Sequence, residues 1–591
     1  MSQFVKGLLA GAALVVVGGF FILLAVGLAV SAVSGSSAPE IRPDSALVVS
    51  LSGDIPEYID QELPNFLAFD QPDQAALFDQ VRAIRRAAED DRIKALVLRC
   101  DGSSSGWAKA QELRWAVQAF KESGKPVWAF MEVAGREDYY IAALADRIVI
   151  QPESYLSLSG LWLEVMFFKG SLDKLGVEAD VIRTGRYKSA GEPYSREEMS
   201  PEWRQVLEEM LDEFYVQLLA GIAEGRGQDA EHWRAVLDEG PFSADEAREH
   251  GLSDDVMYED GFYEELSAAV DVEKIGRVSM SHYALDAAAD TARGASRIAM
   301  VHASGTIRSG YSDPMPFADS SDTLAAGDFI AQMDSLREDE SIDGVILRID
   351  SPGGDAIASE QMLHAVRRLG EEKPVVVSMA NVAASGGYYI AAVPDAPILA
   401  YPGTYTGSIG VFTIRLNLRS LYDKLGITKE ILTRGQFAAL ESDYGPMSSA
   451  ERAKLRGYVD SIYDTFVDRV AEGRGHDAES VAELAEGRVW IGAQAVRNGL
   501  VDELGGYLDA VERVKRIAEI DPDETVEIVT YPERRSLFES LLDGDFRAAA
   551  ARLLVPRELG LARRPAAELE RIASRLGGGP MYMAPFEISV Q

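Results

Sequence analysis

The chain of 591 residues has very little cysteine and few basic residues for its size. Its one cysteine, Cys100, excludes an internal disulfide, and its place after a strand-like apolar run predicts a small buried apolar side chain. Lysine and arginine number 58 against 95 acidic residues, a net charge of −37. A nucleic-acid partner is therefore not expected, because phosphate backbones require an excess of basic side chains. The acidic excess is typical of a solvated surface.

Charged residues are absent from residues 7–38, and residues 8–30 are almost wholly apolar. A helix of 23 residues spans about 34 Å, enough to cross a bilayer. A cleaved signal peptide would have a shorter apolar core, so a retained anchor is favoured. Lys6 precedes the span and acidic residues follow it, which predicts a cytoplasmic N-terminus and an extracytoplasmic body.

The remainder of the chain repeats itself at a spacing of roughly 249 residues. Matched segments include Arg99-Cys100-Asp101 with Arg348-Ile349-Asp350, and Glu224-Gly225-Arg226-Gly227 with Glu472-Gly473-Arg474-Gly475. This period is too long for a solenoid and indicates a domain duplication. The expected divisions are an anchor (1–38), a first copy (45–283), a second copy (297–534) and a helical tail (535–591), with helical patterns at 548–554 and 566–576.

Short β-rich runs alternate with helical patterns in each copy. In the second copy, strands are expected at 298–302, 344–349 and 374–378, with a helix over 358–369 between the last two. This alternation predicts parallel α/β units, in which ligands sit at the carboxyl ends of the strands.

Two glycine-containing loops follow strands of the second copy. In Asp350-Ser-Pro-Gly-Gly, consecutive glycines can direct backbone amides into a cavity, although the loop could be an ordinary turn. The first copy lacks this Pro-Gly-Gly core. In the second loop, Ser385-Gly-Gly, the serine could be a helix N-cap or a nucleophile favoured by the same helix dipole.

A serine nucleophile needs a base. Only one of the six histidines, His476, follows Ser385, and it lies in no recognisable motif, so a Ser-His pair is weakly supported. Lys188 is the alternative, because burial can lower a lysine pKa towards neutrality. The two copies divide these groups: the first has Lys188 but Arg136 in place of the serine, and the second has Ser385 but Ala438 in place of the lysine. The division suggests one composite active site.

Four motifs together resemble signal peptide peptidase A, or protease IV, in its long, duplicated, membrane-anchored form. They are listed in chain order: Gly185-Arg-Tyr-Lys-Ser-Ala, Asp350-Ser-Pro-Gly-Gly, Ala384-Ser-Gly-Gly-Tyr-Tyr and Thr406-Gly-Ser-Ile-Gly. The resemblance covers nearly the whole chain. It implies tandem Clp-protease/crotonase-like α/β domains, preceded by one transmembrane helix.

The resemblance also implies site residues and a function. Ser385 would be the nucleophile and Lys188 the general base, with Ser408 bonded to the lysine and the amides of Gly354 and Gly386 forming the oxyanion hole. The family hydrolyses released signal peptides within their apolar core and needs no metal or cofactor. It assembles as a homo-oligomer, a tetramer for the duplicated form, on the outer side of the inner membrane.

Two other functions share some of these features. A crotonase-like acyl-CoA enzyme would use the glycine amides without a nucleophile, but an extracytoplasmic body argues against CoA chemistry. An inactive scaffold would not need Ser385, Lys188 and Ser408 together. The motifs leave open whether Ser385 meets the Lys188 of its own chain or of a neighbour.

Overall fold

The computed structural model describes residues 41–59, 61–62, 75–289, 296–312, 323–532, 535–536 and 581–583. The expected span at residues 8–30 and both helical patterns of the tail lie outside these residues. Within the described part of the chain, no helix combines the length and apolar character needed to cross a membrane. The described parts of the tail are strands, β22 (Arg535–Ser536) and β23 (Met581–Met583).

The first copy is built on a mostly parallel sheet in the order β7-β5-β4-β3-β1-β9, with β8 beside β5. Its strands are β1 (Ser45–Gly53), β3 (Ile93–Ser103), β4 (Val127–Ala134), β5 (Arg147–Leu156), β7 (Phe242–Ser243), β8 (Asp255–Val256) and β9 (Gly276–Ser279). Its helices are α2 (Leu77–Glu89), α3 (Trp107–Lys121), α4 (Arg136–Ala142), α5 (Lys169–Leu175), α6 (Glu192–Ser195), α7 (Pro201–Arg226), α8 (Ala230–Leu237), α9 (Ala244–Glu249), α10 (Glu259–Ala269) and α11 (Met280–Ala289).

The second copy reproduces this sheet as β19-β17-β15-β13-β10-β21, with β16 beside β15 and β20 beside β16. Its strands are β10 (Arg297–Ser304), β13 (Gly344–Ser351), β15 (Val375–Ala384), β16 (Ile398–Ala400), β17 (Tyr405–Gly407), β19 (Val489–Ile491), β20 (Glu503–Leu504) and β21 (Glu527–Tyr531). Its helices are α12 (Ala326–Glu338), α13 (Ala356–Gly370), α14 (Gly386–Ala391), α15 (Arg419–Leu425), α16 (Ser449–Arg474), α17 (Ala478–Leu484), α18 (Gly492–Arg497) and α19 (Tyr507–Ile517). The predicted α/β class is confirmed.

Local sequence explains the main elements of the second copy. The central strands β10, β13 and β15 are nearly continuous runs of buried residues, as expected of parallel strands covered on both faces. Helix α13 begins where the Asp355 side chain accepts a hydrogen bond from the Ala358 amide, and it buries one apolar face. The predicted strands and the helix over 358–369 are confirmed to within a few residues, except that β15 runs on to Ala384.

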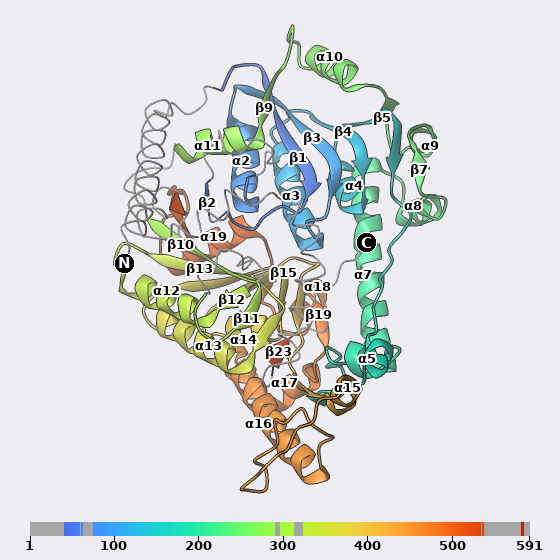
Figure 1. Cartoon of the computed structure of the whole chain (residues 1–591). Coiled ribbons are helices and arrows are strands. Elements are labelled where there is room, and N and C mark those ends of the chain that lie inside the picture. The colour runs from blue at the N-terminus through green and yellow to red at the C-terminus, as the bar shows by residue number, and fades with distance from the viewer. Residues whose placement is uncertain are drawn as a thin grey trace, which may run out of the picture.

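The two copies form an upper and a lower body that pack together (Figure 1). The long helix α7 of the first copy runs down beside the second, and its counterpart α16 lies at the bottom of the second copy (Figure 1). Both helices have 26 residues and begin at a serine, Ser200 or Ser448, whose side chain caps the helix. One apolar core includes residues of both copies, such as Leu96 and Ile346, so the duplicated halves fold against each other.

A third sheet joins the copies in the order β12-β11-β14-β23-β18-β6. Its strands are β12 (Thr323–Ala325), β11 (Thr306–Arg308), β14 (Gly353–Asp355), β23, β18 (Val411–Asn417) and β6 (Glu178–Thr184). Only β6 comes from the first copy, and it pairs antiparallel with β18 over seven residues. This pairing brings the segment after β6, which includes Lys188, into the second copy.

Buried charges also hold the copies together. The Arg348 guanidinium of the second copy donates to the Glu57 carboxylate of the first over 3.0 Å, and both side chains are buried. Burial acts to raise the pKa of Glu57, but the charges of Arg348 and Lys109 overcome it and lower this pKa to about 2. The pair is therefore charged within the protein, and removing one partner would leave an uncompensated buried charge.

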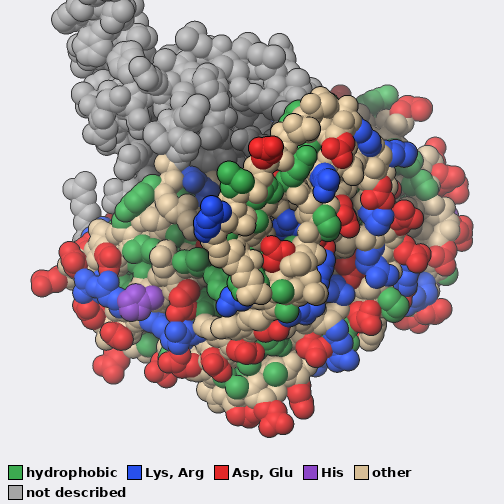
Figure 2. All heavy atoms as spheres, turned by 60° about the horizontal axis from the view of Figure 1, so that its bottom comes forward, with side chains coloured by type: hydrophobic (Ala, Val, Ile, Leu, Met, Phe, Trp, Pro, Cys, Tyr) green, Lys and Arg blue, Asp and Glu red, His purple; other side chains and the backbone are tan. Residues whose placement is uncertain are grey.

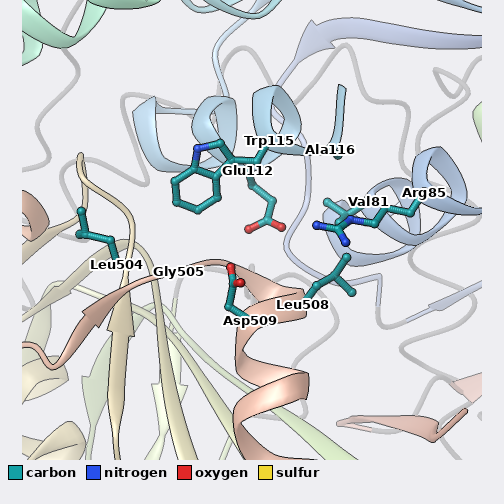
Figure 3. A pocket seen from close by; sticks show the side chains of 9 residues that line it. All are labelled: Val81, Arg85, Glu112, Trp115, Ala116, Leu504, Gly505, Leu508 and Asp509. Atoms are coloured by element: carbon teal, nitrogen blue, oxygen red, sulfur yellow. The ribbon is translucent and has the colours of Figure 1, made fainter. Parts of the chain in front are cut away.

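A pocket of about 270 Å³ lies at the same junction, between α2 and α3 of the first copy and α19 of the second (Figure 3). Glu112, Trp115 and Asp509 are among its lining residues, and Lys188 and Ser385 are not. The Glu112 carboxylate is fixed in position, because it accepts hydrogen bonds from the Tyr401 hydroxyl and the Tyr507 amide. The pocket belongs to the junction between the copies and not to the candidate site.

The surface agrees with the interpretation drawn from composition. On the face that Figure 2 shows, acidic side chains are intermixed with basic ones and form no single cluster. Cys100, predicted to be buried, is fully buried in the first sheet.

Candidate active site

Ser385 lies at the carboxyl end of β15, directly before α14. Its φ of 56° is in the left-handed region, which costs a residue with a Cβ roughly 1–2 kcal/mol. Ser385 is the N-cap residue of α14, as the sequence predicted, but its side chain makes no capping hydrogen bond. The hydroxyl is therefore not used to cap the helix.

Lys188 of the first copy meets that hydroxyl. Its Nζ lies 2.7 Å from the Oγ of Ser385, 3.1 Å from the Oγ of Ser408 and 2.9 Å from the Ser408 carbonyl oxygen. All three residues are fully buried. The structure thus brings Lys188, Ser385 and Ser408 of one chain together, although 197 positions separate the first two in sequence.

Burial shifts the protonation of this lysine. It lowers the pKa of Lys188 well below the ordinary value of 10.5, and no carboxylate in the described part of the chain acts to raise it. Lys109 gives the contrast, because it is also buried but lies near Glu57, Asp350 and Asp54, whose charges raise its pKa. Of these two buried lysines, only Lys188 has an environment suited to a neutral amine.

Close backbone contacts make room for the lysine stem. The Tyr187 amide donates to the Glu486 carbonyl over 2.8 Å and anchors the segment on the second copy. A Cβ on Gly487 would lie 2.6 Å from the Lys188 amide nitrogen, and one on Gly410 would lie 3.2 Å from the Lys188 Cδ. Sequence reasoning missed Gly487. It also gave no role to Gly410, although this glycine ends the motif that contains Ser408.

The two candidate oxyanion-hole glycines lie beside Ser385. Gly354 is in β14, and Gly386 begins α14. A Cβ on Gly386 would lie 3.1 Å from the Gly354 amide nitrogen, and one on Gly354 would lie 2.0 Å from the Ile307 carbonyl oxygen. Gly386 therefore lies close to the Gly353-Gly354 backbone and Gly354 lies close to the backbone of Ile307, which leaves little room for a side chain at either position.

A segment of the chain itself runs along this space. Strand β23 pairs antiparallel with β14, placing Tyr582 opposite Gly354, and it also pairs with β18. An extended peptide can thus add to the sheet beside the candidate oxyanion hole.

His476 does not take part in this arrangement. It is exposed in the loop between α16 and α17, and among the described residues it makes no hydrogen bond with Ser385. Of the two candidate bases, the structure brings only Lys188 to the serine.

The corresponding place in the first copy is filled by its own side chains. Asp138 accepts hydrogen bonds from the Ser103 and Gly135 amides over 3.0 and 2.9 Å, and Arg136 donates to the Gly160 carbonyl over 2.7 Å. Burial raises the pKa of Asp138 to about 6. The sequence indicated that the Pro-Gly-Gly loop was lost here, but it did not reveal that a carboxylate bonds the local amides instead.

A buried Ser–Lys pair beside closely spaced glycine amides, on an α/β fold, defines the class of serine hydrolases. Comparison with known proteins identifies the family more closely. The model of peptidase family S49 matches residues 119–273 and 367–521, once in each copy. The chain belongs to peptidase family S49 and is a serine peptidase of the protease IV/SppA type.

Relatives match over most of their length. The chain is 32% identical to the chloroplastic serine protease SPPA of Arabidopsis thaliana, over 85% of this chain and 74% of that one. It is 31% identical to protease 4 of Haemophilus influenzae, over 86% of this chain and 84% of that one. A putative signal peptide peptidase SppA of Enterococcus faecium is 39% identical over 32% of this chain and 55% of its own.

Proposed function

We propose that this peptidase is a membrane-anchored endopeptidase with a Ser/Lys dyad, and that it degrades released signal peptides within their apolar core. The observation that supports the dyad best is the buried Lys188 amine, whose Nζ lies 2.7 Å from the Ser385 Oγ and whose pKa burial lowers. The Enterococcus faecium relative, a putative signal peptide peptidase, supports the substrate class. Residues 8–30 would form the single-pass anchor, with a cytoplasmic N-terminus and a periplasmic body. Each copy would have the Clp-protease/crotonase-like fold.

The geometry supports the following reaction. The neutral Lys188 amine takes the Ser385 hydroxyl proton as Oγ bonds to the substrate carbonyl carbon. The Gly354 and Gly386 amides stabilise the oxyanion that forms. The Lys188 ammonium then protonates the leaving amine as the peptide bond breaks, leaving an acyl ester on Ser385. The lysine next takes a proton from water, whose oxygen attacks the ester carbon; as the ester bond breaks and the acid leaves, the lysine ammonium returns that proton to the Ser385 Oγ. Ser408 keeps the amine oriented throughout.

A peptide substrate is supported by the position of β23. Because this strand adds to β14 and β18, an extended substrate would bind by the same main-chain pairing, with Gly354 beside its scissile region. Main-chain pairing is tolerant of sequence, which suits a peptidase acting on many signal peptides.

The test combines labelling with digestion. A fluorophosphonate probe should label the wild-type chain in detergent at Ser385 and leave Ser385→Ala and Lys188→Ala unlabelled. Synthetic signal peptides should be cleaved inside their apolar segment, as mass spectrometry of the products would show. Lys109→Met is the matched control, because it removes a buried lysine outside the site. A wild type that neither labels nor cleaves would indicate the acyl-CoA enzyme or the inactive scaffold instead.

A further inference from the structure

The backbone of Lys188 is held by two charged side chains that the proposed reaction does not use. The Arg183 guanidinium, on β6, donates to the Lys188 carbonyl oxygen over 2.8 Å. The same Nη1 donates to the Glu192 carboxylate over 2.7 Å. The Arg183–Glu192 pair therefore connects the carbonyl of the lysine to a carboxylate four residues further along the chain.

The Glu192 carboxylate is itself fixed on both of its oxygens. Its side chain is only 4% exposed, and while Oε1 accepts from Arg183, Oε2 accepts a hydrogen bond from the Ser200 amide over 2.9 Å. Ser200 is the N-cap residue of α7, whose buried side chains belong to the large apolar core. The exposed Arg196 adds a longer contact of 3.8 Å. Hydrogen bonds thus run from the Lys188 carbonyl through the Arg183–Glu192 pair to the start of a long helix.

The second copy shows what the same segment contains where the lysine is absent. The residues that correspond to Arg183, Lys188 and Glu192, each 250 positions later, are Thr433, Ala438 and Ser442. Tyr194 and Tyr444 keep this spacing just beyond the segment. Threonine and serine cannot form an ion pair, so the copy that lacks the lysine lacks the pair as well.

The turn that contains the lysine does not depend on the pair. The Lys188 amide donates to the Gly185 carbonyl over 3.2 Å, and the Ala438 amide donates to the Gly435 carbonyl over 3.4 Å. The two glycines have nearly equal φ values, 104° and 107°. The backbone of the turn is thus alike in both copies, although only the first has the ion pair. The difference assigns the pair to the lysine and not to the formation of the turn.

A lysine base needs such support because its side chain is long and flexible. Its Nζ must nevertheless stay 2.7 Å from the Ser385 Oγ. The close contacts of Gly410 and Gly487 confine the stem, and the bond from Arg183 to the Lys188 carbonyl fixes the backbone from which the stem starts. Fixing this backbone matters because a displacement of about 1 Å between reacting groups can cost about 10²-fold in rate.

We propose that Arg183 and Glu192 are positioning residues for the base: together they fix the Lys188 backbone so that its amine meets Ser385. They act through that backbone and not on the reacting atoms, and the inference rests on the proposed role of Lys188. In the third sheet β18 lies between β6 and β23, so Arg183 is one strand removed from the place where an extended substrate would pair. Loss of the pair should therefore reduce turnover and leave peptide binding nearly unchanged.

Steady-state cleavage of a synthetic signal peptide by the full-length chain in detergent tests the proposal. Arg183→Met and Glu192→Gln should each lower kcat at least about tenfold, with KM within about twofold of the wild-type value. The rates are divided by the folded fraction from circular dichroism. Arg183→Lys should be less impaired than Arg183→Met, because its ammonium can still donate to both acceptors.

Arg226 and Asp254 give a matched control at the other end of α7. Arg226 donates to the Gly251 carbonyl over 3.0 Å and to the Asp254 carboxylate over 2.8 Å, and Asp254 accepts from the Ile148 amide over 2.7 Å. These are the same kinds of contact that the Arg183–Glu192 pair makes. Arg226→Met and Asp254→Asn should therefore lower the thermal transition and leave kcat of the folded protein at the wild-type value.

A double-variant cycle tests whether the two residues act together. Arg183→Met combined with Glu192→Gln should lose no more than about twofold beyond the more impaired single variant, because either change alone already breaks the connection. Losses that multiply in the double variant would overturn the joint action.

Two outcomes separate this inference from the proposed function. If Lys188→Met loses turnover while Arg183→Met keeps the wild-type kcat, or loses no more than Arg226→Met, the positioning role is refuted and the dyad stands. If Lys188→Met cleaves like the wild type, the dyad is refuted and the positioning role with it.

Discussion

The rate at which Ser385 reacts should follow the titration of Lys188. Below the pKa of this lysine the neutral fraction falls tenfold for each pH unit, so the logarithm of the acylation rate constant should rise with a slope of one. Above that pKa the rate should level off. Burial lowers this pKa, so the plateau begins well below the pH of about 10.4 at which a solvated lysine titrates.

The magnitude of the effect follows from the contacts at Nζ. A general base within hydrogen-bond distance contributes about 10²–10⁴-fold, or about 3–5 kcal/mol of activation free energy. Lys188→Met, which keeps the stem but removes the amine, should lose this factor and the pH dependence together. Ser408→Ala removes one of three contacts of Nζ and should cost only about 2- to 10-fold.

The assay measures the rate at which a fluorescent fluorophosphonate phosphonylates Ser385. The rate is monitored by fluorescence at each pH between 5 and 10. It measures attack by the serine directly and does not depend on peptide binding or product release. Lys109→Met should keep the wild-type profile, scaled only by the folded fraction. A rate that falls as the pH rises, or a Lys188→Met variant with the wild-type slope, would refute the assignment of Lys188 as the base.

Three further predictions concern the surroundings of the dyad. Gly386→Ala should reduce kcat about 10²-fold or more with the fold retained, because its Cβ would lie 3.1 Å from the Gly354 amide nitrogen and displace an oxyanion donor; wild-type turnover would exclude that role. Lys109→Met should lower the unfolding free energy by about 3–5 kcal/mol at neutral pH, seen in chemical denaturation, since the raised pKa of Lys109 keeps it charged beside Glu57 and Asp350; an unchanged midpoint would contradict this. Truncation after residue 536 should lower KM for peptides, because β23 pairs with the strands that a substrate would use; an unchanged KM would mean that β23 does not compete.

Structural features that depend on short stretches of sequence were predicted well. The alternation of strands and helices in the second copy, the burial of Cys100 and the N-cap position of Ser385 all follow from neighbouring residues. They are predictable because periodicity and turn chemistry act over a few residues.

Some contacts between distant segments were not predicted. Nothing in the sequence indicated that Asp138 would bond the Ser103 amide or that Gly487 would pack against Lys188. Each contact joins residues that only the packed fold brings together, and none leaves a periodic or compositional pattern.

The sequence by itself determined the duplication and the division of serine and lysine between its halves, because aligned repeats reveal which side chain replaces which. Tertiary structure alone decided that the two halves complete one site within a single chain. It did so through the pairing of β6 with β18, which carries Lys188 across the junction, and through burial, which lowers the pKa of that lysine. The pKa of a lysine depends on the solvent and charges around it, and no residue type at a given position specifies those.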